Sequence, residues 1–140
     1  MTGPRVFAGG MAVALVVSAA AVGSGAAHST VKLPAPLVGA WGRTVTKAQW
    51  QSVGIATEPT AHFSMLVSSD GSIIVAESTS VRFAPLSGNR IVISGAYGCG
   101  KKKGIYHWSV AAGRLTLTKL QDTCAYSFGL YAGVWKREKT

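Results

Sequence analysis

Acidic side chains are scarce in this sequence, which has five Asp and Glu against fourteen Lys and Arg and a formal net charge of +9. Charged residues of both signs make up only 14% of the chain and hydrophobic residues 48%, a balance that excludes extensive disorder. The length of 140 residues excludes a multidomain assembly and most large enzyme folds, because one domain usually takes about 100–200 residues. The composition therefore predicts a basic protein with a single folded domain.

The sequence also lacks a cluster of side chains that could work together in catalysis. It contains no Gly-x-Ser-x-Gly motif, the pattern of one common serine nucleophile. The acids Asp70, Asp122 and Glu138 fall in a turn, in a loop and in the tail, where turn stabilisation and solubility explain them. His62 and His107 alternate with apolar neighbours and should face solvent. We therefore expect no catalytic residue, no cofactor and no metal site, and a protein that is not an enzyme.

Residues 1–27 have the order of a secretory signal peptide. Arg5 supplies the positive charge, residues 6–22 are almost entirely apolar, and the segment ends in Gly25, Ala26 and Ala27. We expect cleavage after Ala27, a secreted, extracellular protein that could also stay at the cell envelope, and no transmembrane domain in the mature chain. An uncleaved anchor is the alternative, because the apolar stretch approaches the lower limit for a membrane span.

A copper site at the new N-terminus would need the amine and imidazole of His28 together with a second histidine in reach. We do not expect one, because residues 28–36 carry two prolines and no periodicity, which predicts a flexible leader. The folded domain is expected to cover residues 37–138.

Only two cysteines are present, Cys99 and Cys124, and both lie in the part expected to be exported. In an oxidising compartment two cysteines of a small domain pair more often than they stay free, so we expect a disulfide. Metal binding would need more ligands than these two thiols supply. Closing a loop of this length stabilises a fold by about 3.5 kcal/mol on the chain-entropy model.

The folded part begins with an expected strand over residues 37–45. Thr46 and Gln49 then have the spacing of a capping box, which predicts one short helix at about 47–53 with Trp50 and Val53 turned inward. After this helix the apolar period falls to two, and turns rich in Gly, Asp, Asn and Ser separate short segments. Further strands are expected at 61–67, 72–77, 80–84, 90–94, 105–110, 114–118 and 130–137.

Eight short strands with short links predict an all-β, antiparallel up-and-down barrel, because neighbouring strands can pair in chain order. A two-sheet sandwich with Greek-key crossings is the alternative. The alternation assigns these side chains to the interior: Trp41, Phe63, Met65, Val67, Ile73, Val75, Val81, Phe83, Ile91, Ile93, Tyr106, Trp108, Leu115 and Leu117. This bulky set favours a filled or narrowly open barrel.

Two short motifs, Gly39-Ala40-Trp41 and the closing cluster Gly133-Val134-Trp135-Lys136-Arg137, carry a family resemblance. With the runs at 104–108, 113–118 and 122–124, the chain resembles small secreted bacterial proteins of lipocalin-like, or calycin, type. The resemblance covers roughly residues 37–137 and implies a β-barrel that binds a ligand. It also implies that Trp41 packs at the barrel end against Lys136 or Arg137. The chain is shorter than a typical lipocalin.

The pattern and the resemblance together predict a non-catalytic binding protein that holds a small hydrophobic ligand in its barrel. The ligand-lining residues would come from the inward-facing set: Phe63, Met65, Ile73, Val75, Phe83, Ile91, Ile93, Tyr106, Trp108, Leu115 and Leu117.

Two alternatives involve a macromolecular partner. Small secreted barrels also occur as inhibitors of proteases, and the leader at 28–36 could enter an enzyme's cleft. The chain could instead bind a polyanion at the cell envelope, because Lys101, Lys102 and Lys103 form its densest charge. The simpler interpretation is that these lysines belong to a solvated loop and bind no partner.

Overall fold

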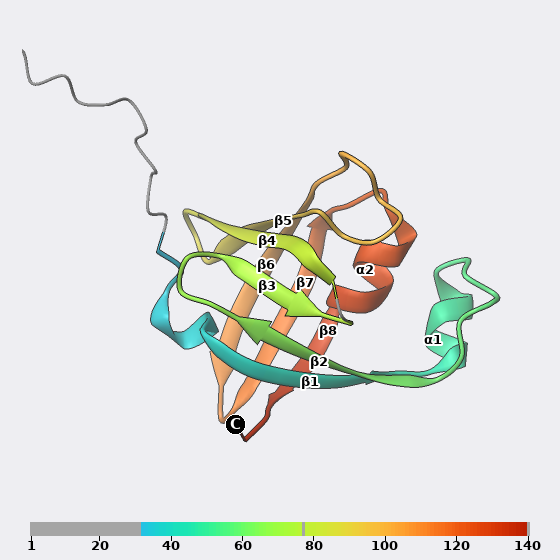
Figure 1. Ribbon diagram of the computed structural model, residues 1–140, viewed down its shortest axis with the longest axis horizontal. Coiled ribbons are helices and arrows are strands. Elements are labelled where there is room, and N and C mark those ends of the chain that lie inside the picture. Colours follow the sequence, from blue (N-terminus) through green and yellow to red (C-terminus); the bar gives the residue numbers. More distant parts are fainter. Residues whose placement is uncertain (1–31, 77, 140) are drawn as a thin grey trace, which may run out of the picture.

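Alternating apolar and polar residues form eight strands that pair in chain order and close into an antiparallel barrel (Figure 1). The computed structural model describes residues 32–76 and 78–139. The strands are β1 (Gly39–Val45), β2 (Ala61–Val67), β3 (Ser72–Val75), β4 (Ser78–Leu86), β5 (Arg90–Ser94), β6 (Gly104–Ala111), β7 (Arg114–Gln121) and β8 (Gly133–Arg137). β1 also pairs with β8, with Trp41 opposite Arg137 and Gly42 opposite Lys136. The predicted up-and-down barrel is confirmed.

The barrel interior holds the side chains that the alternation assigns to it. Thirteen of the fourteen predicted interior residues are buried, and Phe63 is half-buried against them. Burial of each large apolar side chain stabilises the fold by about 1.5–3 kcal/mol, so this set dominates the stability. Most of the barrel is therefore filled by its own side chains.

A short helix, α1 (Lys47–Ser52), follows β1 and lies beyond the end of the barrel (Figure 1). The Thr46 side chain accepts a hydrogen bond from the Gln49 backbone N–H, and the Gln49 side chain accepts one from the Thr46 N–H. This capping box satisfies two backbone donors at the helix start. Trp50 is buried, and it packs with Val45 and Ile55 in a second small apolar cluster.

A second helix, α2 (Ala125–Tyr131), was not expected from the sequence. It occupies residues 130 and 131, which were assigned to the last strand, and β8 begins only at Gly133. Cys124 at its N-cap makes no side-chain capping bond, and Gly129 lies inside it. With weak local signals, this helix depends on tertiary packing. Gly129 lies directly against the Trp50 ring, where a Cβ atom would be 2.7 Å from Trp50 Cζ3.

The segment before β1 closes one end of the barrel. A 3₁₀ turn, η1 (Ala35–Leu37), places Leu37 in the core, and Leu33 is also buried. The Leu33 N–H donates a hydrogen bond to the Ser69 carbonyl at 2.8 Å. The expected flexible leader is therefore wrong for residues 33–36, because Leu33 packs against the core. The predicted signal peptide at 1–27 and residues 28–31 lie outside the described residues.

At this closed end, Trp41 and Arg137 stack on each other. The Arg137 guanidinium lies 4.2 Å from the centre of the Trp41 ring. The same guanidinium donates to the carbonyls of Val38 and Pro36, both at 3.2 Å. The Trp41 Nε1–H donates to the Leu37 carbonyl at 2.9 Å. Of the two basic residues considered as partners of Trp41, Arg137 takes this place, and Lys136 is exposed.

Candidate ligand cavity at the open end of the barrel

The end of the barrel opposite η1 contains a cavity of about 270 Å³. Its walls come from the region of α1, from β2, β3 and β4, from the loop between β5 and β6, and from α2, which lies at this end in Figure 1. The lining residues are Trp50, Glu58, Phe63, Val75, Ala76, Ser78, Val81, Ala96, Tyr97, Tyr126, Leu130 and Tyr131. The cavity thus begins where the filled interior of the barrel ends.

Aromatic rings that contact one another form a large part of the cavity wall. The Trp50 ring lies 6.2 Å from Phe63 in an edge-on arrangement and 6.2 Å from Tyr126. Tyr97 meets Tyr126 nearly at a right angle, with ring centres 5.9 Å apart. These distances are typical of favourable aromatic pairs, each of which contributes about 0.5–1.5 kcal/mol beyond area burial. The rings therefore support one another as a wall.

The exposure of these rings distinguishes the rim of the cavity from its floor. Tyr97 is 79% exposed and so belongs to the rim. Tyr131, at the last turn of α2, is only 1% exposed and also contacts Phe83 of the filled core. Burial raises the pKa of the Tyr131 phenol, which therefore stays neutral at ordinary pH.

The Trp50 side chain also places a polar group, its indole N–H, in this region. Its Nε1–H is buried and has no hydrogen-bond partner among the described residues. Its six-membered ring packs on Gly129, so the indole nitrogen lies on the opposite edge of the side chain. A buried donor without a partner costs about 1–3 kcal/mol, which the packing of this ring must offset.

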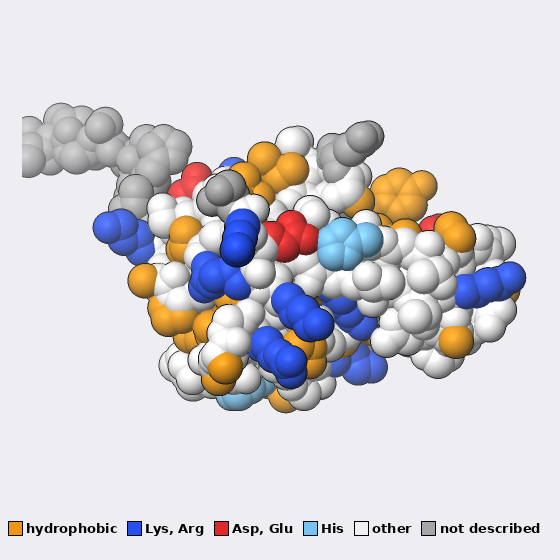
Figure 2. All heavy atoms as spheres, turned by 90° about the horizontal axis from the view of Figure 1, so that it is seen from below, with side chains coloured by type: hydrophobic (Ala, Val, Ile, Leu, Met, Phe, Trp, Pro, Cys, Tyr) orange, Lys and Arg blue, Asp and Glu red, His pale blue; other side chains and the backbone are white. Residues whose placement is uncertain are grey.

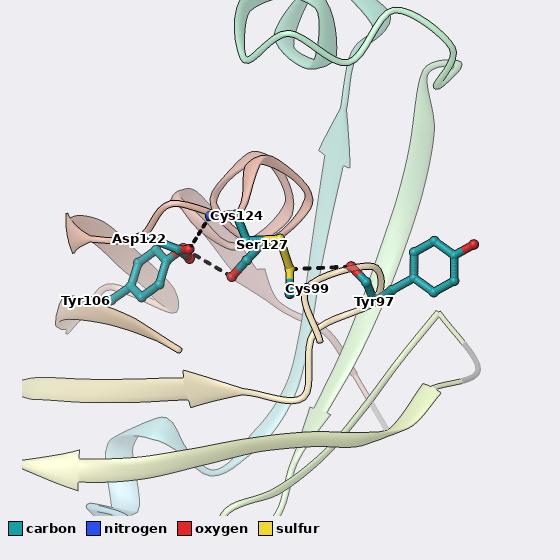
Figure 3. The surroundings of a disulfide bond; sticks show 6 residues. All are labelled: Tyr97, Cys99, Tyr106, Asp122, Cys124 and Ser127. Atoms are coloured by element: carbon teal, nitrogen blue, oxygen red, sulfur yellow. Dashed lines mark hydrogen bonds between the residues drawn. A yellow bond between two sulfur atoms is a disulfide. The ribbon is translucent and has the colours of Figure 1, made fainter. Parts of the chain in front are cut away.

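A disulfide fixes the loop and the helix that carry Tyr97 and Tyr126 (Figure 3). Cys99, in the loop between β5 and β6, is bonded to Cys124 just before α2, and their Cα atoms are 5.7 Å apart. The predicted pairing of the two cysteines is confirmed. Because the bond joins two walls of the cavity, it limits how far those walls can separate.

A buried polar cluster supports the same junction (Figure 3). The Tyr106 hydroxyl donates to the Asp122 carboxylate, which also accepts the Cys124 N–H at 2.9 Å. Burial, followed by the hydrogen bond to Asp122, raises the pKa of Tyr106. Asp122 is 8% exposed, so the solubility role expected for it from the sequence is wrong. Its carboxylate instead orders the chain between β7 and α2.

Among the described residues that line the cavity, Glu58 is the charged one. It lies in the segment between α1 and β2 and is half-buried. The three lysines at 101–103 are exposed on the loop between β5 and β6 and are not part of the cavity wall. The described wall of the cavity is therefore apolar with one carboxylate, although the chain as a whole is strongly basic.

The structure divides the expected ligand-lining residues into two groups. Phe63 and Val75 line the cavity. The others lie in the filled core instead: Met65, Ile73, Phe83, Ile91, Ile93, Tyr106, Trp108, Leu115 and Leu117. All of them are kept from the cavity for the same reason: bulky side chains that point inward from neighbouring strands contact one another and leave no space for a ligand.

Sequence reasoning missed most of the residues that do form the wall. Glu58, Tyr97 and Tyr126 lie in a loop or in the unexpected helix, where a strand pattern assigns no side chain to the interior. One available signal was the position of Tyr97 and Tyr126, each two residues from a cysteine of the predicted disulfide.

A second, polar groove lies outside the barrel, over β1 and β8. Figure 2 shows the face seen from below in Figure 1, where Lys and Arg side chains are spread out and histidine and acidic side chains meet near the centre. In the groove, His62 Nε2 lies 2.8 Å from a Glu138 carboxylate oxygen, and the Ser64 hydroxyl donates to the same carboxylate. The hydrogen bond from His62 lowers the pKa of Glu138. This contact ties residue 138 to β2.

Within residues 32–76 and 78–139, no three His, Cys, Asp or Glu side chains lie close enough to hold a metal ion. The helices in these ranges are all too short or too polar to cross a membrane. No protein-family model, no curated protein and no solved structure matches this chain.

Proposed function

We propose that this chain is a non-catalytic binding protein that holds one small, largely apolar ligand at the open end of its barrel. The observation that carries the proposal is the aromatic-lined cavity, which remains open although the rest of the barrel is filled. Ligand sites are typically concave, mostly apolar, and equipped with a few polar groups. The mouth of a β-barrel is one of their common locations.

The size of the cavity limits the ligand. An apolar cavity of about 150 Å³ accepts benzene, so 270 Å³ corresponds to a ligand of roughly ten to twelve non-hydrogen atoms. The volume lies just below the usual range of about 300–1,000 Å³ for small-molecule sites. A single substituted aromatic ring fits this space, and a long-chain lipid does not.

The expected signal peptide and the disulfide support secretion as part of the proposal. Disulfides persist in oxidising compartments, and Cys99–Cys124 stabilises a wall of the site. A ligand carried by such a protein would be met outside the cell or in its envelope. The mass of the protein recovered from the growth medium would test this, because cleavage after Ala27 and one disulfide give a single expected value.

Calorimetric titration with 2-phenylethanol, a neutral compound with one aromatic ring, tests the cavity. We expect binding to the unmodified protein and loss of binding in Ser78→Trp, which places a large side chain in the wall at the start of β4. Ser80→Trp is the matched control, since Ser80 is exposed on the same strand and does not line the cavity. Equal binding by both variants would overturn the proposal, and so would failure of the unmodified protein to bind either this alcohol or one-ring ligands of similar size that carry a charge.

A further inference from the structure

The charge of the cavity wall is opposite to the charge of the protein. Lys and Arg outnumber Asp and Glu fourteen to five in the sequence. A wall assembled without regard to charge would therefore carry a base more often than an acid. Among the described residues that line the cavity, the charged one is nevertheless Glu58.

The Glu58 carboxylate has no side-chain or backbone partner among the described residues. In the described part of the chain, no Lys, Arg or His forms an ion pair with it, and it accepts no hydrogen bond. It lies in the connection between α1 and β2, half-buried at the edge of an apolar space. A carboxylate in that setting can accept hydrogen bonds from a ligand.

The rest of the wall also favours a positive charge. Five of the twelve described residues that line the cavity are aromatic, and three of these are tyrosines of a chain that has four. The face of an aromatic ring carries negative potential and attracts an ammonium group, most strongly where water is excluded. Aromatic rings that line the same cavity as a carboxylate can hold an organic cation together with it.

We propose that the ligand of this cavity is a small organic amine, whose ammonium group is held by Glu58 and the surrounding rings while its apolar part fills the cavity. This inference rests on the proposed function and specifies its ligand class. Glu58 supplies a charge-assisted hydrogen bond, and Trp50, Phe63 and Tyr126 supply the aromatic faces. The exposed Tyr97 lies at the rim, where the amine enters.

Three ligands of nearly equal size test the charge preference: 2-phenylethylamine (a cation), 2-phenylethanol (neutral) and phenylacetate (an anion). The field of a chain with net charge +9 favours phenylacetate, so a preference for the amine must come from the cavity itself. We expect the amine to bind about tenfold or more tightly than the alcohol, and phenylacetate to bind weakest. The measurement is calorimetric titration at fixed ionic strength.

Substitutions at position 58 decide whether Glu58 is the cause. Glu58→Gln should bring the amine to the affinity of the alcohol and leave the alcohol unchanged, and Glu58→Lys should make phenylacetate bind better than the amine. Asp70→Asn is the matched control, because Asp70 is an exposed acid in the turn before β3 and does not line the cavity. It should bind all three ligands like the unmodified protein.

The possible outcomes separate this inference from the proposed function. Equal binding of amine and alcohol, tightest binding of phenylacetate, or an amine preference that survives Glu58→Gln would overturn the amine inference. In each case binding of the alcohol would still support a ligand cavity. Failure of all three ligands to bind would overturn both.

Discussion

The substitution Gly129→Ala tests how α1 and α2 pack to form the cavity. An alanine inside a helix normally stabilises it by about 1 kcal/mol relative to glycine. Here the new Cβ atom would lie 2.7 Å from Trp50 Cζ3, 3.0 Å from Trp50 Cε3 and 3.1 Å from Val53 Cγ2. Forcing extra volume into a packed site costs about 1–3 kcal/mol. Since the Trp50 ring is also in contact with Phe63 and Tyr126, it cannot move away freely.

The packing cost therefore exceeds the gain in helix propensity, and Gly129→Ala should lower the free energy of unfolding by about 1 kcal/mol. Urea denaturation measures this change. Trp50→Leu removes the ring that the new methyl group meets, so in that background Gly129→Ala should become neutral or stabilising. A stabilising effect of Gly129→Ala in the unmodified protein would refute the contact between α2 and Trp50.

Three further predictions concern the disulfide, the acid response and the basic loop. Replacing Cys99 and Cys124 by serine should lower the free energy of unfolding, measured by urea denaturation, by about 3.5 kcal/mol, which is the loop-closure value. A loss below about 1 kcal/mol would contradict the chain-entropy argument. The lowered pKa of Glu138 means that its contribution is present above its ordinary pKa of 4.5 and lost as the pH falls through the lower folded value. The melting temperature of Glu138→Gln should therefore lie below that of the unmodified protein at pH 7, and this difference should disappear in acid. An equal difference in melting temperature at pH 7 and in acid would contradict the contact with His62. Replacing the exposed lysines at 101–103 by glutamine should weaken retention on heparin at low salt, measured by the salt needed for elution, and leave binding of 2-phenylethanol unchanged. Unchanged elution would remove the basis for polyanion binding by this loop.

The barrel itself was predictable because its sequence signals are repeated. A period of two recurs along the strands, as in Phe63, Met65 and Val67 of β2, and short turns force neighbouring strands to pair. Each strand therefore specified its own inward face, and the topology followed from the links. The disulfide was predictable from the number of cysteines and from the oxidising compartment that the expected signal peptide implies.

The cavity was not predictable by the same reasoning, because most of the residues that line it lie in helices and loops rather than in strands. α2 has an uncapped start and an internal Gly129, so nothing local distinguishes residues 125–131 from a loop. It packs against Trp50, which is remote in the sequence. The alternation along a strand predicts which side chains point into the barrel, but it does not predict how far along the barrel axis these side chains fill the interior.

The pairing of β1 with β8 has a consequence for when the barrel can form. Arg137 bonds to the Pro36 carbonyl across a separation of 101 residues and stacks on Trp41. Contacts between such distant positions form late, because the loop that they close carries the largest entropy cost. During synthesis the barrel therefore cannot close before residue 137 has been added. Until then the chain lacks the contacts that close the barrel, which is compatible with the export proposed for this protein.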